Sequence, residues 1–122
     1  MPNNSPLTQL TDANFSEVVE QPGVIAMVEF WASWCMPCRM LEPVVRQVAE
    51  SFGDQIKVAL VDTDKHRDTA QRFEINAVPT IVLFRDGEVI HRVIGLTSFE
   101  KLAGAIDAAL AASHGATGTA AG

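Results

Sequence analysis

A nearly unbroken apolar run constrains the fold of this 122-residue chain more than any other segment. Residues 24–31 have the length of a β-strand, and their apolar side chains occupy both phases of the strand alternation. That pattern is typical of a strand covered on both faces, which lies inside a sheet that has helices on either side. The run therefore predicts the central strand of an α/β domain.

Further strand signals lie on both sides of this run. Residues 7–10 predict a short edge strand, and residues 56–61 predict a second buried strand. Residues 80–85 and 88–94 flank Asp86-Gly87, a dipeptide that suits a two-residue turn, so they predict a β-hairpin. In its second strand, we expect Val89, His91 and Val93 to alternate with Ile90, Arg92 and Ile94.

Helix signals fill the intervals between the strands. The segment 35–50 has apolar residues at helical spacing, with an end near Gly53 and a kink expected at Pro43. Its apolar positions are Met40, Leu41, Val44, Val45 and Val48. The order β-α-β-α-β-β-α then requires a central sheet with helices on both of its faces.

Polar residues predict where the other helices begin. Capping boxes, in which a Glu follows the cap by three positions, predict the first and last helices. A short polar helix between them is expected to be capped by Asp64. The two capping boxes are Asn14 with Glu17, and Thr97 with Glu100. The last helix then has one apolar face, formed by Phe99, Leu102, Ile106 and Leu110.

Composition and charge narrow the domain organisation and the function classes. Hydrophobic residues make up 48% of the chain, enough for one domain with its own core. We expect a domain over residues 1–112 and a flexible tail over residues 113–122, which are small and polar. A net charge of −6 argues against nucleic acid as the main partner. No apolar run approaches the roughly 20 residues that span a bilayer, and the start lacks a secretory signal pattern, which favours the cytoplasm.

The two cysteines, Cys35 and Cys38, lie at the junction of the apolar strand and the helix that follows it. Unpaired N–H groups and the dipole at a helix start favour a thiolate, which is the nucleophile of thiol–disulfide exchange. A second cysteine one turn along the helix can attack the mixed disulfide. The spacing therefore supplies an attacking group and a resolving group.

Three other interpretations of the cysteine pair compete with redox chemistry. A structural disulfide across so short a loop removes little entropy from the unfolded chain. A structural zinc ion needs four ligands, and the histidines (His66, His91 and His114) are scattered along the chain. Two inert thiols at a helix start remain an alternative. A Cys-x-x-Cys pair within a strand–helix–strand pattern favours the redox interpretation.

The segment Phe30-Trp31-Ala32-Ser33-Trp34-Cys35-Met36-Pro37-Cys38 resembles the active site of thioredoxins, whose common form is Trp-Cys-Gly-Pro-Cys. The similarity extends over residues 7–112 and includes Pro43, Val78-Pro79-Thr80, Asp86-Gly87 and Gly95. It implies the thioredoxin fold, an α/β fold in which helices flank a central mixed sheet on both faces.

The resemblance also implies roles for individual residues. Cys35 would be the exposed attacking thiol and Cys38 the more buried resolving thiol, with Trp31 packed beneath the site. Pro79 would be preceded by a cis peptide bond, and the backbone of Val78 would pair with an extended substrate segment. Gly95 would keep the docking surface flat. The substrate-binding residues implied in this way are Trp34, Met36, Pro37, Val78, Pro79 and Gly95.

Three positions depart from the usual thioredoxin pattern. Glu29 stands inside the apolar run where the family has a buried Asp, and we expect it to exchange protons with Cys38 at a pKa raised by desolvation. Leu60 occupies the place of a buried Lys, which removes a charge that would stabilise the acid. Met36 replaces the Gly between the cysteines, a change that can shift the reduction potential or broaden the apolar docking patch.

The remaining polar candidates have structural interpretations. Asp62, Asp64 and Asp68 are expected to cap or solvate a helix rather than hold a cation. Charged residues on the helix that follows the cysteines, namely Arg39, Glu42, Arg46 and Glu50, are expected to form surface ion pairs. His91 is expected to be a residue of the sheet.

The expected function is that of a monomeric protein-disulfide reductase. The dithiol itself carries the two electrons, so no bound cofactor is expected. The resemblance implies that electrons arrive from NADPH through a flavin-containing thioredoxin reductase, and that the substrates are disulfide-containing proteins. One alternative is an oxidase or isomerase of an exported compartment, since Met36 leaves the potential open. A second is a thioredoxin-fold docking subunit without catalysis.

Overall fold

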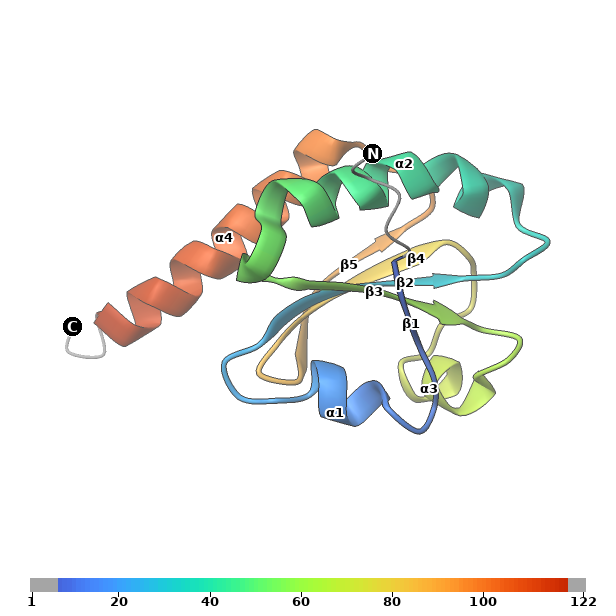
Figure 1. Ribbon diagram of the computed structural model, residues 1–122, viewed down its shortest axis with the longest axis horizontal. Helices are drawn as coiled ribbons and strands as arrows, with labels where there is room; N and C mark the ends of the chain where they lie inside the picture. The colour runs from blue at the N-terminus through green and yellow to red at the C-terminus, as the bar shows by residue number, and fades with distance from the viewer. Residues whose placement is uncertain (1–6, 119–122) are drawn as a thin grey trace.

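The computed structural model describes residues 7–118, and the side chains of residues 7–112. Five strands form one sheet in the order β1-β3-β2-β4-β5 (Figure 1). The strands are β1 (Thr8–Leu10), β2 (Ile25–Trp31), β3 (Lys57–Asp62), β4 (Thr80–Arg85) and β5 (Glu88–Ile94). The helices are α1 (Phe15–Val19), α2 (Met36–Phe52), α3 (Arg67–Arg72) and α4 (Phe99–Gly118), with a 3-10 turn η2 (Gly53–Gln55) after α2. The sequence-based order of elements and the α/β class are confirmed.

The apolar run forms β2 at the centre of the sheet, as predicted. It pairs in parallel with β3 and antiparallel with β4, and six of its seven residues are buried. In Figure 1, α2 and α4 lie on one side of the sheet, and α1 and α3 lie on the other. Both faces of β2 are therefore covered, which accounts for apolar residues at both phases of the alternation.

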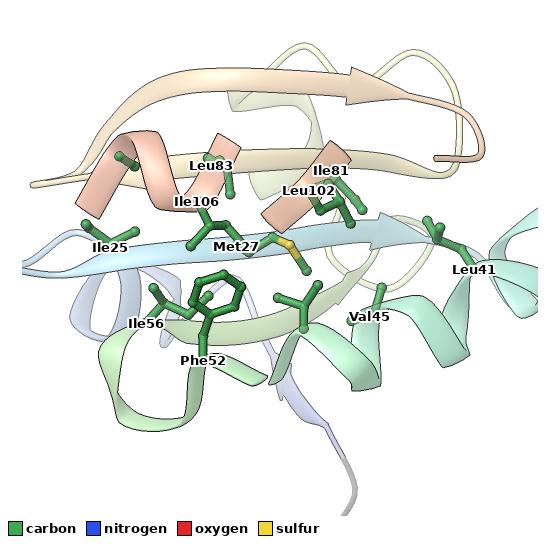
Figure 2. Packing of buried hydrophobic residues seen from close by; sticks show 12 residues of the cluster. Ile25, Met27, Leu41, Val45, Phe52, Ile56, Ile81, Leu83, Leu102 and Ile106 are labelled. Atoms are coloured by element: carbon green, nitrogen blue, oxygen red, sulfur yellow. The ribbon is translucent and has the colours of Figure 1, made fainter. Parts of the chain in front are cut away.

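Two hydrophobic clusters hold these layers together. Between the sheet and the α2/α4 layer, Met27 and Ile81 of the sheet face Val45 of α2 and Ile106 of α4 (Figure 2). On the opposite face, the rings of Phe15, Phe73 and Phe84 contact one another at centroid distances of 5.1–5.6 Å. These clusters fix the end of β2 relative to the start of α2, where the cysteines lie.

The side-chain caps expected at three helix starts are not the ones observed, although Asn14 does stand at the expected position before α1. Asn14 precedes α1, but its side chain accepts a hydrogen bond from the N–H of Thr11 at 2.7 Å and does not cap the helix. At the start of α4, the cap is Ser98, whose hydroxyl accepts from the N–H of Lys101 at 3.2 Å. Helix α3 begins after His66 rather than at Asp64.

Two surface patterns also differ from expectation. Met40 was expected on the apolar face of α2, yet it is exposed, while Leu41, Val45 and Val48 are buried. Strand β5 does not alternate strictly, because its pairing with β4 shifts register at Leu83/Phe84. The shift places Ile90 and Val93, rather than alternate residues, against the core.

The predicted boundary between domain and tail falls inside α4. Helix α4 continues through Gly118, beyond the predicted domain end at residue 112. Residues 1–6, and residues 119–122 of the predicted tail, lie outside the described residues. The boundary between domain and tail stays a prediction. Within residues 7–118, no helix has both the length and the apolar character that crossing a membrane requires.

Candidate active site

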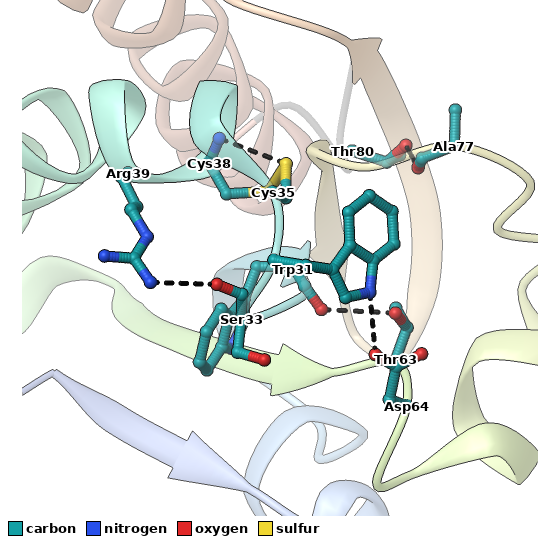
Figure 3. The surroundings of a disulfide bond; sticks show 10 residues. Trp31, Ser33, Cys35, Cys38, Arg39, Thr63, Asp64, Ala77 and Thr80 are labelled. Carbon is teal, nitrogen blue, oxygen red and sulfur yellow. Dashed lines mark hydrogen bonds between the residues drawn. A yellow bond between two sulfur atoms is a disulfide. The ribbon is translucent and has the colours of Figure 1, made fainter.

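The junction of β2 and α2 positions both cysteines. Cys35 is the residue that precedes α2, and its backbone is extended, with φ −89° and ψ 107°. Its sulfur accepts a hydrogen bond from the N–H of Cys38 at 3.2 Å (Figure 3). Pro37 fits the first turn because the N–H that it lacks would have no partner within the helix. The sulfur of Cys35 therefore lies where the start of α2 stabilises negative charge once the pair is reduced.

Cys35 and Cys38 are joined by a disulfide, with their Cα atoms 5.3 Å apart. Only 3% of Cys35 and 5% of Cys38 is exposed. The expectation of an exposed Cys35 beside a more buried Cys38 is wrong for this oxidised state. The reason is that both cysteines pack with Ala32, and that Trp31 and Val78 cover this small cluster.

Exposed apolar side chains surround the buried disulfide. Trp34 is 70% exposed and Met36 is 64% exposed. The indole N–H of Trp34 donates to the carboxylate Oδ2 of Asp64 at 2.9 Å, which fixes the orientation of the ring. The site therefore presents an apolar rim to solvent while its sulfurs lie just beneath.

The loop before β4 completes this rim. The Val78–Pro79 peptide bond is cis, as the resemblance implied. The N–H of Gly95 donates to the carbonyl of Pro79 at 2.8 Å, and Gly95 has a φ of +91°, a conformation that suits glycine. Since Val78 also packs on the cysteines, the structure brings Val78, Pro79 and Gly95 together beside the disulfide.

Three exposed apolar residues at this rim were missed by the sequence analysis. Ile94 and Leu96 flank Gly95, and Met40 follows Met36 by one helical turn. The signal that could have found the first two is their position on either side of a glycine in the motif. For Met40, the apolar stripe of the helix had instead predicted a position on the buried face.

A cavity of about 410 Å³ is lined by both Cys38 and Glu29. Only 3% of Glu29 is exposed, and its Oε2 atom has no hydrogen-bond partner. Burial, followed by the nearby charge of Glu42, raises the pKa of Glu29 to about 7. The residues that line the cavity are Leu7, Gln9, Glu29, Trp31, Ser33, Cys38, Arg39, Glu42, Arg46 and Leu60.

Comparison with known proteins agrees with this fold and site. The family profile described as Thioredoxin matches residues 6–108. The chain belongs to the thioredoxin family. It is 39% identical over 98 residues to Thioredoxin 1 of Synechococcus elongatus, which covers 80% of this chain and 92% of that protein. It is 38% identical over 101 residues to a thioredoxin of Staphylococcus haemolyticus, covering 83% and 95% of the two chains.

Family membership decides between the interpretations of the cysteine pair. As a member of the thioredoxin family, the chain is a thiol–disulfide oxidoreductase with the activity of a protein-disulfide reductase. Cys35 and Cys38, already at disulfide distance, form its redox-active pair. The site therefore needs no further chemical group to carry two electrons.

Hydrogen bonds from other residues stabilise the backbone that leads to the cysteines of this thioredoxin-family site. The carbonyl of Trp31 accepts from the N–H of Thr63 at 2.9 Å, and Arg39 donates to the carbonyl of Ser33 at 3.0 Å (Figure 3). Both bonds fasten the segment between β2 and the cysteines. The indole Nε1 of Trp31 is buried and has no hydrogen-bond partner.

The weaker polar candidates lie in separate places. Asp62 accepts from the backbone N–H groups of Asp64 and Lys65, so it organises the turn after β3. The described residues contain no group of three or more His, Cys, Asp or Glu side chains that could hold a metal ion. Arg46 and Glu42 form the expected ion pair at 2.8 Å.

Proposed function

We propose that Cys35 is the attacking thiol and Cys38 the resolving thiol of this reductase. The Cys35 thiolate attacks a disulfide of a substrate protein, forms a mixed disulfide and releases one substrate thiolate. The Cys38 thiolate then attacks the Cys35 sulfur, and the second substrate thiolate leaves. Two electrons pass from the dithiol to the substrate. The observation that carries this assignment is the place of the Cys35 sulfur at the start of α2, where it accepts the N–H of Cys38.

Glu29 takes the proton that Cys38 must lose before it attacks. Both residues line the same cavity, and a carboxyl group whose pKa is near 7 accepts and returns protons at neutral pH. Glu29 thus replaces the Asp that is usual in the family. The burial of Glu29 supports this role. Its register partner on β3 is Leu60, which supplies no positive charge that would stabilise the ionised carboxylate.

Substrate proteins dock on the rim around the disulfide. The exposed side chains of Trp34 and Met36 supply apolar contact, and Pro37 stiffens the turn between the cysteines. The backbone of Val78, held by the cis bond to Pro79, pairs with an extended segment of the substrate. Gly95 adds no side chain to the neighbouring surface. A Cβ at this position would meet no atom within 4 Å, so it would project into open space.

We propose a cellular setting in which the electron supply is the one that the family resemblance implies. A flavin-containing thioredoxin reductase returns electrons from NADPH to the Cys35–Cys38 disulfide. The chain acts as a monomer in the cytoplasm, where it contributes to electron transport and to cell redox homeostasis.

Single-cysteine variants test the assignment of the two thiols. With Cys38→Ser, we expect a stable mixed disulfide between Cys35 and a protein substrate, detected by mass spectrometry of linked peptides. With Cys35→Ser, we expect no such adduct and a loss of turnover. An adduct on Cys38 as abundant as that on Cys35 would overturn the assignment.

The reduction potential of the pair tests the direction of electron flow. Equilibration against glutathione buffers, followed by thiol trapping, measures it directly. A potential below that of the glutathione couple agrees with a reductase. A potential well above it would instead indicate the oxidase or isomerase.

A further inference from the structure

One side of α2 carries three cavity residues at regular spacing. Cys38, Glu42 and Arg46 follow one another at intervals of four positions, so they lie along one face of the helix. The same cavity is lined by Glu29 from β2. Glu42 therefore stands one turn beyond the resolving cysteine, at the border between the buried carboxyl group and solvent.

The charged residues that line the cavity beside Glu29 all belong to α2. Among the described residues that line the cavity, Leu7 precedes β1, Gln9 lies on β1 and Leu60 lies on β3, and none of the three is charged. On β4, the residue paired with Glu29 is the apolar Ile81. The titratable or charged groups of the cavity are Glu29, Cys38, Arg39, Glu42 and Arg46.

We propose that Glu42 is a positioning residue for the resolving step: its carboxylate lines the cavity one helical turn beyond Cys38 and opposes ionisation of Glu29, the acceptor of the Cys38 proton. This inference rests on the proposed role of Glu29. Glu42 does not touch the reacting sulfurs and acts only through the charge of Glu29. The sequence analysis had interpreted it as a surface ion-pair residue.

The charges of Glu42 and Arg46 have opposite effects on the ionisation of Glu29. The negative charge of Glu42 disfavours ionisation of Glu29, in addition to the larger effect of burial. Arg46 holds the Glu42 carboxylate at 2.8 Å and partly offsets its field. Removing either charge should therefore move the ionisation of Glu29, and the two removals should move it in opposite directions.

The proton balance of the resolving step connects Glu42 to the rate. The ionised carboxylate of Glu29 takes the proton from the Cys38 thiol, and the resulting thiolate forms the disulfide with Cys35 while the substrate thiolate leaves. When Glu29 is already protonated, it cannot accept this proton. A lower pKa of Glu29 therefore extends efficient resolution to lower pH.

A carbon NMR titration of the Glu29 carboxyl group in the disulfide form tests the electrostatic claim. We expect Glu42→Gln to lower the pKa of Glu29 and Arg46→Gln to raise it. Glu50→Gln is the matched control, since Glu50 is exposed on α2, about 12 Å further along the helix, and does not line the cavity. Equal titrations of the Glu42→Gln and Glu50→Gln variants would overturn the proposal.

A kinetic measurement tests the effect on the resolving step. The Cys35 mixed disulfide is prepared in acid, the pH is raised abruptly, and release of the substrate thiol is followed. Glu42→Gln should move the midpoint of the rate profile to lower pH. A displacement of half a pH unit corresponds to about a threefold faster release well below the midpoint.

The same experiment separates this proposal from the one on which it rests. If Glu29→Gln removes the midpoint but Glu42→Gln leaves it in place, the role of Glu42 is wrong and that of Glu29 stands. If the wild-type profile has no midpoint that Glu29→Gln removes, the role of Glu29 as proton acceptor is wrong.

Discussion

Two carboxyl groups in this molecule show opposite responses to the protein around them. Asp12, in the loop between β1 and α1, accepts hydrogen bonds from the backbone N–H of Thr69 at 2.9 Å and from its hydroxyl at 2.5 Å. These bonds hold the pKa of Asp12 below its ordinary value. Glu29 lies in the centre of the sheet with an unpartnered oxygen, and burial raises its pKa to about 7.

The difference teaches that burial and the supply of donors together decide how readily a carboxyl group ionises. Asp12 joins two segments 57 positions apart and gives the third residue of α3 an acceptor that the helix's own cap does not supply. The Oε2 atom of Glu29 has no such donor, so burial, and then the charge of Glu42, favours the protonated form. An acid of the second kind lowers stability once it ionises.

The largest expected effect comes from Glu29→Gln. In the folded protein the pKa is about 7, against 4.5 for an unperturbed Glu, so folding favours the protonated form. The resulting penalty is absent well below pH 4.5 and complete above pH 7, where it reaches about 3 kcal/mol. We therefore expect the variant to gain stability relative to wild type as the pH rises from 4 to 8.

Urea denaturation across this pH range measures the gain. Glu50→Gln serves as the control, because it removes the same charge from an exposed position. A constant difference between Glu29→Gln and wild type at every pH would mean that Glu29 ionises in the folded protein as easily as in the unfolded chain, and the comparison would fail.

Leu60→Lys should make Glu29 resemble Asp12. Leu60 is in register with Glu29 on the neighbouring parallel strand, and both line the cavity. An ammonium group there is expected to lower the pKa of Glu29 by about 1 to 3 units, as seen by carbon NMR. Leu60→Met, which is long but neutral, should leave the titration unchanged, and equal shifts in both variants would point to a packing effect instead.

Much of the fold could be predicted from the sequence because its strands are strongly patterned. The run that forms β2 and the hairpin of β4 and β5 both depend on local signals. Helix caps could not be predicted to the residue, since the side chain of Asn14 accepts from the N–H of Thr11 while the hydroxyl of Thr11 accepts from the N–H of Asn14. The register shift between β4 and β5 has no local signal in the sequence.

The site was predictable where chemistry is tied to spacing and not where it depends on surroundings. The cysteine pair and Glu29 follow from residue type and position. The burial of Cys35 does not, because Val78 and Trp31 cover it from other segments. The same holds for Met40, since an apolar residue on a helix can face either the core or a docking surface.

A smaller effect is expected from Asp12→Ala, which removes the acceptor of Thr69. Because the pKa of Asp12 is lowered in the folded state, its stabilising contribution is present above pH 3.8 and is lost as the pH falls through the folded value. We expect a lower denaturation midpoint at pH 7 than for Asp54→Ala, a control at an exposed acid. Equal midpoints for the two variants would show that Asp12 does not stabilise the fold.

The smallest expected effect isolates one of the two donors to Asp12. Thr69→Val removes the hydroxyl and keeps the backbone N–H, so the pKa of Asp12 should rise toward 3.8 without reaching it. Thr69→Ser keeps the hydroxyl and should preserve the wild-type titration by carbon NMR. If Val and Ser give the same pKa, the hydroxyl is not what distinguishes Asp12 from Glu29. If only Val raises it, the hydroxyl of Thr69 helps to keep Asp12 ionised, a contribution that the unpartnered Oε2 atom of buried Glu29 lacks.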